Sequence, residues 1–296
     1  MIRFEAITKK FGSVEAIRSL DLDVRRDEWL GLLGHNGSGK TTLIRMLLGL
    51  SQPSSGRILL DGAPASESGW RRFRDKLGFM PERISFYENL TGQETLLYFC
   101  KLRGAAIETV PVILERVGLA DAAARKVGGY SKGMRQRLNL GQALLGEPEM
   151  LVMDEPIEGL DPHGVQELFE LVRAGGVRTV VLSSHRLSEV SDRMDRVCIL
   201  GNGSVVALGS VEELFERLDL PVRVHIYPTQ SLNGTLAAAL RRLGPTSIVE
   251  KNGVLIVEVL QKDKADFLFG LQSCQQAIRH LHVEEPSLER VYFEAE

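Results

Sequence analysis

A glycine-rich segment with one lysine and two threonines is the clearest place in the sequence for chemistry on phosphate. It spans residues 34–42 and reads GHNGSGKTT, which matches the G-x-x-x-x-G-K-[ST] pattern of phosphate-binding loops. Glycines let the backbone approach phosphate oxygens and aim N–H groups at them, at the positive end of the next helix. We therefore expect a triphosphate site formed by Gly34, His35, Asn36, Gly37, Ser38, Gly39, Lys40, Thr41 and Thr42.

Two side chains of this loop have distinct expected roles. Lys40 is expected to hold the β- and γ-phosphates, and Thr41 to offer its hydroxyl to Mg²⁺, which takes oxygen ligands in an octahedron. The competing interpretation is a glycine-rich turn that only caps a helix. The flanking pattern disfavours that interpretation, because the apolar stretch WLGLLG runs into the glycines and KTTLIRMLLGL after them has helical periodicity.

A second candidate group is a pair of carboxylates at the end of an apolar run. The segment MLVMDEP covers residues 150–156 and ends in Asp154 and Glu155. Asp154 is expected to hold the Mg²⁺ hydration shell, and Glu155 to orient the attacking water or accept its proton. Two acids after a strand can also simply begin a helix. That alternative weakens because the same chain carries a phosphate loop.

The elements that must position these residues alternate between strands and helices. Residues 1–30 alternate apolar and polar positions and predict antiparallel strands. Residues 91–145 predict a block of helices separated by glycines and short polar links. Three apolar strands then follow with helices between them: EMLVMDEP, VRTVVLSS and DRVCILG. This order predicts an α/β fold with a mostly parallel sheet and an inserted helical subdomain at about 83–147.

A second, smaller unit is expected from Pro221 onward. Its strands and helices follow the order β-α-β-β-α-β, with Asn252-Gly253 suited to a type I′ hairpin turn. That order predicts a small ferredoxin-like α+β domain. We therefore divide the chain into a catalytic domain at 1–220 and an accessory domain at 221–296.

Composition limits the classes of protein to consider. The 44% hydrophobic and 25% charged residues are typical of a folded globular chain, and a net charge of −3 provides no broad attraction for nucleic acid. The first residues carry charges, and no apolar run approaches the length of a membrane span. Three widely spaced cysteines fit neither a disulfide framework nor a zinc site. We expect a cytoplasmic protein that is neither exported nor inserted in a membrane.

The segment YSKGMRQRLNLGQAL at 130–144 resembles the signature segment of ABC ATPases, usually written LSGGQ. Ser131 and Gly133 match it, whereas Lys132 and Met134 depart from the commonest form. The resemblance implies an ABC-type P-loop NTPase fold in which Ser131, Gly133 and Met134 contact the γ-phosphate of ATP held by a second subunit. A helix merely capped by Ser131 is the plainer alternative.

Further segments resemble the same family and lie in the expected order. GLD at 159–161 resembles the D-loop, and His185 after TVVLSS resembles the switch histidine that bonds the γ-phosphate. The side chains of His35 and His163 are expected to be structural. The resemblance implies that Phe11 stacks on adenine, with an ordinary core phenylalanine as the alternative.

One position departs from the family. Glu82 in GFMPERISFYENLT occupies the place of the Q-loop glutamine. A carboxylate there can approach Mg²⁺, but it adds negative charge near the phosphates. We expect Glu82 to join Thr41 and Asp154 at the metal.

Within the family, PERISFYENLTGQETL and YSKGMRQRL resemble the ATPase subunit of the copper-processing complex that matures nitrous oxide reductase. The resemblance implies two copies under a membrane permease, on the inner face of the cell membrane, acting with a periplasmic accessory protein in denitrification. A generic drug or lipid exporter shares much of this pattern.

Three other classes of protein fit the sequence less well. A soluble ABC protein acting on ribosomes or DNA usually has two ATPase units or a long coiled-coil insertion, and neither is visible. A nucleotide switch without hydrolysis conflicts with intact Lys40, Asp154, Glu155 and His185. A GTPase is disfavoured because no NKxD-type motif occurs. An ATPase that uses ATP and Mg²⁺ is the expected function.

Overall fold

The computed structural model describes residues 1–296 except 84, 219, 230–233, 289 and 291–296. It divides into two compact units, Met1–Ser210 and Val211–Glu296. The expected boundary at 220 therefore falls one helix late, because α8 (Val211–Leu218) groups with the second unit.

A six-stranded sheet forms the centre of the first unit. Its order is β10-β9-β3-β8-β7-β6, and all neighbouring pairs are parallel except β10 and β9. The strands span β3 Trp29–Leu33, β6 Leu77–Met80, β7 Met150–Met153, β8 Thr179–Ser184, β9 Arg196–Gly201 and β10 Ser204–Gly209. Strands β7 and β8 are buried along their whole length, as continuous apolar runs predict for strands covered on both faces. The carboxyl ends of the parallel strands meet at one edge.

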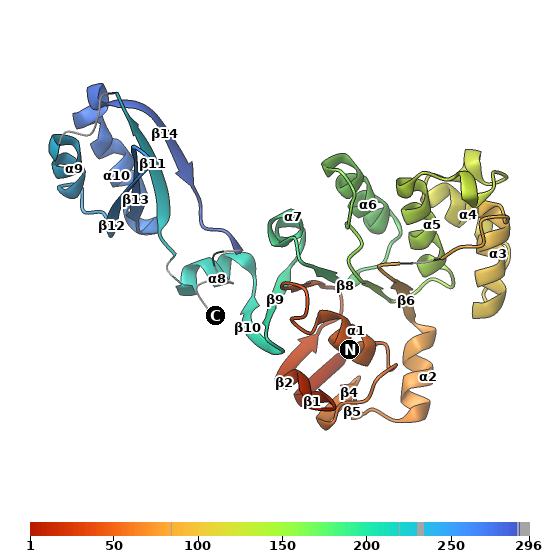
Figure 1. Cartoon of the computed structure of the whole chain (residues 1–296). Helices are drawn as coiled ribbons and strands as arrows, with labels where there is room; N and C mark the ends of the chain where they lie inside the picture. The colour runs from red at the N-terminus through yellow and green to blue at the C-terminus, as the bar shows by residue number, and fades with distance from the viewer. Residues whose placement is uncertain (84, 219, 230–233, 289, 291–296) are drawn as a thin grey trace. The chain divides into compact units, whose positions relative to one another are not determined.

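An antiparallel sheet packs beside the central sheet (Figure 1). It has the order β2-β1-β4-β5 and comprises β1 Ile2–Phe11, β2 Val14–Val24, β4 Ser55–Leu60 and β5 Ala63–Pro64. Its inward side chains, such as Phe4 and Leu20, share one core with α1 (Lys40–Leu47) and α2 (Glu67–Asp75). The alternating burial along β1 and β2 agrees with the predicted half-exposed strands.

The helical subdomain comprises α3 Gly92–Arg103, α4 Thr109–Arg116 and α5 Lys132–Leu144 (Figure 1). Helix α3 begins with a capping box, in which Thr91 and Glu94 bond each other's backbone N–H groups. Helix α5 begins at Ser131, whose hydroxyl accepts a hydrogen bond from the Met134 N–H at 3.2 Å. After this subdomain, α6 (Pro162–Ala174) and α7 (Leu187–Val190) connect the strands of the central sheet.

The second unit has the predicted β-α-β-β-α-β order after α8. Strands β11 Val222–Pro228, β12 Ser247–Lys251, β13 Val254–Val259 and β14 Ile278–Glu284 form an antiparallel sheet with the order β12-β13-β11-β14. Helices α9 (Gly234–Arg241) and α10 (Lys264–Gly270) contribute Leu236, Leu240 and Phe267 to one core. Asn252 and Gly253 both have positive φ, at 52° and 76°, as a type I′ turn requires. This is the ferredoxin-like arrangement, although residues 231–233 of the predicted helix lie outside the described chain.

Across the part of the chain that the structure describes, no helix combines the length and apolar character needed to span a bilayer.

Candidate nucleotide site

Lys40 is the buried cation of the site, at the first position of α1 behind the glycine-rich loop. Its Nζ donates to the backbone oxygens of Gly34 at 2.6 Å and His35 at 3.2 Å. It also lies 3.3 Å from Glu155 Oε1, with about 6% and 9% of the two side chains exposed. A charge this well buried is retained only with such partners. The loop therefore orients its lysine toward the carboxylate at the end of β7.

The glycines of the loop serve different purposes. A Cβ at Gly34 would lie 2.4 Å from the Leu200 carbonyl oxygen, and one at Gly39 would lie 2.9 Å from the Ala16 oxygen. A Cβ at Gly37 would meet nothing within 4 Å, although its φ of 89° strains any other residue. Gly34 and Gly39 are thus required by packing, and Gly37 forms the open part of the loop.

The two carboxylates after β7 are held by a serine at the end of β8. Ser183 Oγ donates to Asp154 Oδ1 at 2.6 Å and accepts from the Glu155 N–H at 2.9 Å. Glu155 has a φ of 46°, a left-handed conformation that costs free energy in a residue other than glycine. Such a conformation persists only where surrounding contacts fix it, and the bond from its N–H to fully buried Ser183 is one of them. The sequence did not single out Ser183, because its role depends on the pairing of β7 with β8.

Glu155 also contacts the predicted switch histidine. His185 Nδ1 lies 2.9 Å from Glu155 Oε2, and the His185 N–H donates to the same oxygen at 3.3 Å. The other oxygen, Oε1, is buried without a hydrogen bond and faces Lys40. Lys40, Glu155 and His185 come from three segments of the chain and form one cluster. This buried carboxylate oxygen forms an ion pair with Lys40 but no hydrogen bond, so it is suited to accept one from water.

Asp154 is placed where a divalent cation would be favourable. Burial raises the pKa of its carboxyl above the usual value, and the charges of Glu155 and Glu82 raise it further, against the Ser183 hydrogen bond and the Lys40 charge. Among the described residues, no group of three His, Cys, Asp or Glu side chains is arranged to hold a metal. One carboxylate and the Thr41 hydroxyl suit Mg²⁺, which commonly keeps waters and phosphate oxygens as its other ligands.

Glu82 lies at the edge of this cluster. Its side chain is about 36% exposed and accepts a hydrogen bond from Arg83 Nε at 3.1 Å. Its charge still acts on the pKa of Asp154. Direct metal ligation by Glu82 thus stays a prediction.

The signature residues lie at the exposed start of α5. Ser131 is exposed, and a Cβ at Gly133 would meet no atom within 4 Å. Gly159 of the GLD segment packs so closely against the Lys132 side chain that a Cβ there would clash with its Nζ. Asp161 caps α6 through the Gly164 N–H at 2.8 Å. The signature and GLD segments are therefore neighbours.

Phe11 and two other histidines complete the predicted set. The ring of Phe11 is 51% exposed at the end of β1, with Lys9 Nζ 5.2 Å from its centre. This exposure excludes the core alternative and suits a stacking surface. His35 is exposed and its Nδ1 contacts the Asn36 oxygen at 2.5 Å, while His163 is exposed on α6.

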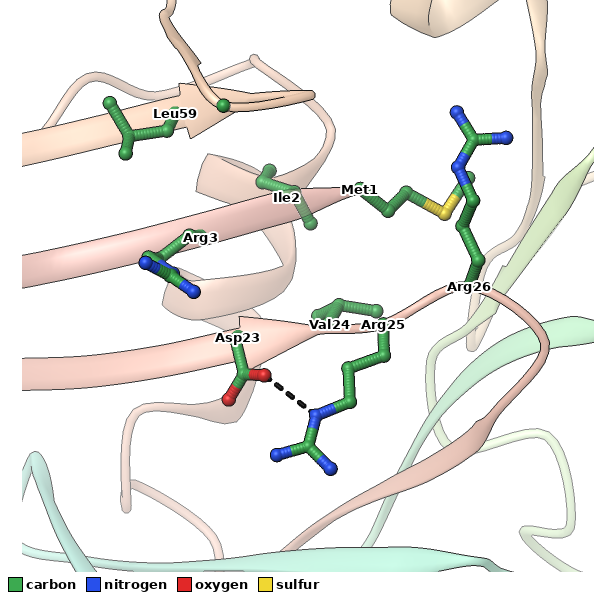
Figure 2. Close-up of a pocket in the computed structure, with 9 residues that line it drawn as sticks. Met1, Ile2, Arg3, Asp23, Val24, Arg25, Arg26 and Leu59 are labelled. Atoms are coloured by element: carbon green, nitrogen blue, oxygen red, sulfur yellow. Dashed lines mark hydrogen bonds and ion pairs between the residues drawn. The ribbon is translucent and has the colours of Figure 1, made fainter.

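A separate pocket of about 340 Å³ opens on the antiparallel sheet, where Arg3, Asp23 and Arg25 lie close together (Figure 2). Arg25 Nε donates to Asp23 at 2.8 Å, and Arg26 pairs with Asp61 at 3.0 Å. The lining of the pocket includes none of the predicted site residues. The pocket does not belong to the nucleotide site.

Comparison with known proteins agrees with this geometry. The ABC transporter family model matches residues 17–158. The uncharacterized ABC transporter ATP-binding protein YhaQ of Bacillus subtilis is 32% identical over 99% of this chain and 98% of its own. The linearmycin resistance ATP-binding protein LnrL of Bacillus subtilis is 30% identical over 99% and 97%. The daunorubicin resistance ATP-binding protein DrrA3 of Streptomyces coeruleorubidus is 33% identical over 98% and 94%.

Solved structures show the same fold. The ATP-binding subunit of an ABC transporter superposes with a TM-score of 0.65 at 27% identity, covering 74% of this chain and 93% of that one. A bacterial Atm1-family ABC exporter with ATP bound gives a TM-score of 0.65 at 25% identity, and the match covers 73% of this chain and 39% of the exporter chain. The phosphate loop, the carboxylates after β7 and the extent of these matches lead to one conclusion: the chain belongs to the family of ABC transporter ATP-binding proteins and is an ATPase.

Proposed function

We propose that this ATPase is the motor of an exporter, in which Glu155 prepares the water that attacks the γ-phosphorus of ATP. The observation that carries the proposal is the position of Glu155. Its carboxylate lies between Lys40 at 3.3 Å and His185 at 2.9 Å, at the end of a strand beside the phosphate loop. A carboxylate so placed can accept a proton from water.

The expected reaction is hydrolysis of the terminal phosphate. Water attacks the γ-phosphorus, its proton passes toward Glu155, and the bond from the γ-phosphorus to the bridging oxygen breaks to give ADP and phosphate. Lys40 exchanges its loop carbonyls for phosphate oxygens. His185 would bond the γ-phosphate. Thr41 and Asp154 would hold Mg²⁺, which neutralises phosphate charge when bound.

We propose that the active unit is a two-fold dimer of this chain. Ser131 is exposed at the start of α5, and a Cβ at Gly133 would meet no atom within 4 Å. A helix start offers unpaired N–H groups to an anion. In a two-fold arrangement, the Ser131 end of one chain would meet the γ-phosphate held by the other, and two shared sites would result.

The membrane partner is proposed to bind beside Glu82. Tyr87 and Tyr98 are 60% and 41% exposed, with ring centres 5.9 Å apart, and Leu102 on the same helix as Tyr98 is 67% exposed. Exposed aromatic groups are enriched at protein interfaces. This surface follows Glu82 directly in the chain, so a permease bound there could respond to the state of the site.

The aromatic surface can be tested without affecting the ATPase itself. Tyr87→Ala should weaken association with the permease about tenfold or more, because interface aromatics often dominate binding. Basal ATP hydrolysis should stay within about twofold. Phe269→Ala removes a still more exposed ring in the second unit and serves as the control. Equal retention of permease by both variants in co-purification would refute this docking site.

The transported substrate is proposed from the relatives. LnrL and DrrA3 carry the names of linearmycin and daunorubicin resistance, so export of an apolar antibiotic or a lipid-like molecule is the first candidate. The copper-processing complex for nitrous oxide reductase is the second candidate, supported by the segments PERISFYENLTGQETL, YSKGMRQRL, QALLGEP and LDLPVRV. That assignment would add a periplasmic accessory protein. Either assignment would place the chain at the cytoplasmic face of a membrane.

Replacing Glu155 tests the proposed chemistry. Glu155→Gln keeps the size of the side chain but removes the carboxylate, so hydrolysis should fall by roughly 10²–10⁴ while ATP still binds. Glu158→Gln, an exposed change three residues along the same loop, is the matched control and should hydrolyse normally. Phosphate release and nucleotide binding are measured on both. A wild-type rate in Glu155→Gln would refute the proposed role.

A further inference from the structure

One face of the signature helix carries a row of side-chain amides. Gln136, Asn139 and Gln142 of α5 are spaced three residues apart and lie on the same side of the helix. Each donates a hydrogen bond to a backbone oxygen outside the helix. These three residues are called the amide row.

Two members of the amide row bond the backbone next to the site carboxylates. Gln136 Nε2 donates to the Pro156 oxygen at 2.5 Å, and Pro156 directly follows Glu155. Asn139 Nδ2 donates to the Pro81 oxygen at 2.9 Å, and Pro81 directly precedes Glu82. One helix therefore holds the peptide beside each carboxylate.

The third member holds the second in place. Gln142 Nε2 donates to the Phe79 oxygen in β6 at 2.7 Å and lies 3.2 Å from Asn139 Oδ1. Asn139 is 1% exposed, so a backbone oxygen left without its amide would stay buried and unpaired. These bonds fix the amide of Asn139 and the path of the chain from β6 to Glu82.

The same helix begins at exposed Ser131. An α-helix moves largely as a rigid unit, so a shift of its Ser131 end also moves the amides further along it. The peptides bonded to those amides precede or follow Glu82 and Glu155, whose charges both act on the pKa of Asp154. The amide row thus connects the helix start to two carboxylates of the chain's own site.

We propose that Gln136, Asn139 and Gln142 are positioning residues that set Glu155 and Glu82 when the Ser131 end of their helix engages the nucleotide of a second chain. The proposal rests on the shared-site dimer proposed above. It assigns to α5 a second role beyond contact with the partner's γ-phosphate: it aligns the carboxylates of its own site. Catalysis in the two sites would then be coupled through α5.

The test compares Asn139→Leu and Gln142→Leu with Gln166→Leu, which replaces an exposed amide on α6. In both amide-row variants kcat should fall roughly ten- to a hundredfold, because small displacements of catalytic groups slow the reaction strongly. KM for ATP should stay within about twofold of the wild-type value. The control should keep wild-type values. Gln142 is only half-buried, so its variant serves if Asn139→Leu does not fold. Thermal melting of each variant reports on folding.

A double-mutant cycle separates coupling from general damage. Ser131→Ala removes the residue at the helix start, and Asn139→Leu or Gln142→Leu added to it should lower kcat by less than about twofold further. Losses that multiply independently, or an unchanged kcat in both single variants, would overturn the proposal. Glu155→Gln is measured in parallel. A wild-type rate in Glu155→Gln would refute the proposed function itself. Near-background hydrolysis in Glu155→Gln, together with wild-type kcat in the Asn139→Leu and Gln142→Leu variants, would overturn only the positioning role of the amide row.

Discussion

The two units of the chain hold their polar groups in different settings. In Met1–Ser210, Lys40, Asp154 and Glu155 are buried together, and Glu155 adopts a left-handed backbone conformation. In the described part of Val211–Glu296, an ion pair of Arg223 with Glu258 at 3.0 Å and a hydrogen bond between His225 and Glu284 at 2.8 Å span neighbouring strands. Buried charges and a left-handed backbone conformation cost free energy of folding. The first unit contains both, and we expect function to maintain them there.

This difference suggests that the second unit contributes no group to ATP chemistry. Among its described residues, Arg223 and Glu258 pair across the sheet, and the core is built from aliphatic side chains and Phe267. We propose a regulatory or dimer-stabilising role for it.

Loss of the buried cation should have the largest effect. Lys40→Ala removes the charge expected to hold the β- and γ-phosphates, so kcat/KM for ATP should fall roughly a hundredfold or more. Lys76→Ala removes a half-exposed lysine of the same unit that pairs with Glu149 at 2.7 Å, and it should change little. Steady-state hydrolysis measures both. An unchanged rate in Lys40→Ala would end the assignment of the site to the first unit.

Removal of the second unit should have a much smaller effect on nucleotide binding. A chain that ends at Ser210 retains every predicted site residue and should bind ATP within about twofold of the full chain. Fluorescent nucleotide titration of both proteins measures the affinity, and circular dichroism checks folding. Complete loss of ATP affinity in a folded truncated protein would show that the second unit supports the site.

Acid should affect the second unit through its cross-strand carboxylate, with the smallest expected effect. Burial alone would raise the pKa of Glu258, but hydrogen bonds from Arg223 and Ser247 and nearby arginine charges hold it below the usual value. The folded-state pKa is lowered, so the stabilisation is present above the unfolded pKa near 4.5 and is lost as the pH falls through the folded pKa. At neutral pH it is worth about 0.2–1 kcal/mol for a partly exposed pair.

Glu258→Gln should therefore lower the melting temperature of the second unit at pH 7 and leave it nearly unchanged at pH 3. Glu250→Gln, an exposed change on the neighbouring strand β12, is the control. Calorimetry of the full chain at several pH values measures both. Equal destabilisation by Glu258→Gln at pH 7 and pH 3 would contradict the assigned cause.

The sequence predicted the phosphate loop and the carboxylates because those signals are local. GHNGSGK directly follows one strand, and MLVMDEP covers one strand and the turn after it. Each motif therefore positions its functional residues without long-range contacts. Ser183 and the amide row were missed because their partners are 20 to 63 residues away and are fixed only by strand pairing and helix packing. Strand β10 was not predicted, although the sequence contains a signal for it. Asn202 and Gly203 form the turn between β9 and β10, with φ of 48° and 82°.

The domain boundary could not be set to the residue from sequence. The segment VEELFERLDL is a helix by pattern, but pattern alone does not say which of two cores receives it. In the structure it groups with the second unit, which therefore begins at Val211.

The most direct test of the shared-site account is the size of the Glu155→Gln protein with MgATP and with MgADP. ATP that is bound but not hydrolysed should hold two chains together, because Ser131 and Gly133 of each chain are proposed to contact the γ-phosphate on the other. Light scattering should then give a dimer with MgATP and a monomer with MgADP. A Glu155→Gln protein that binds MgATP yet stays monomeric, even together with its membrane partner, would contradict the account.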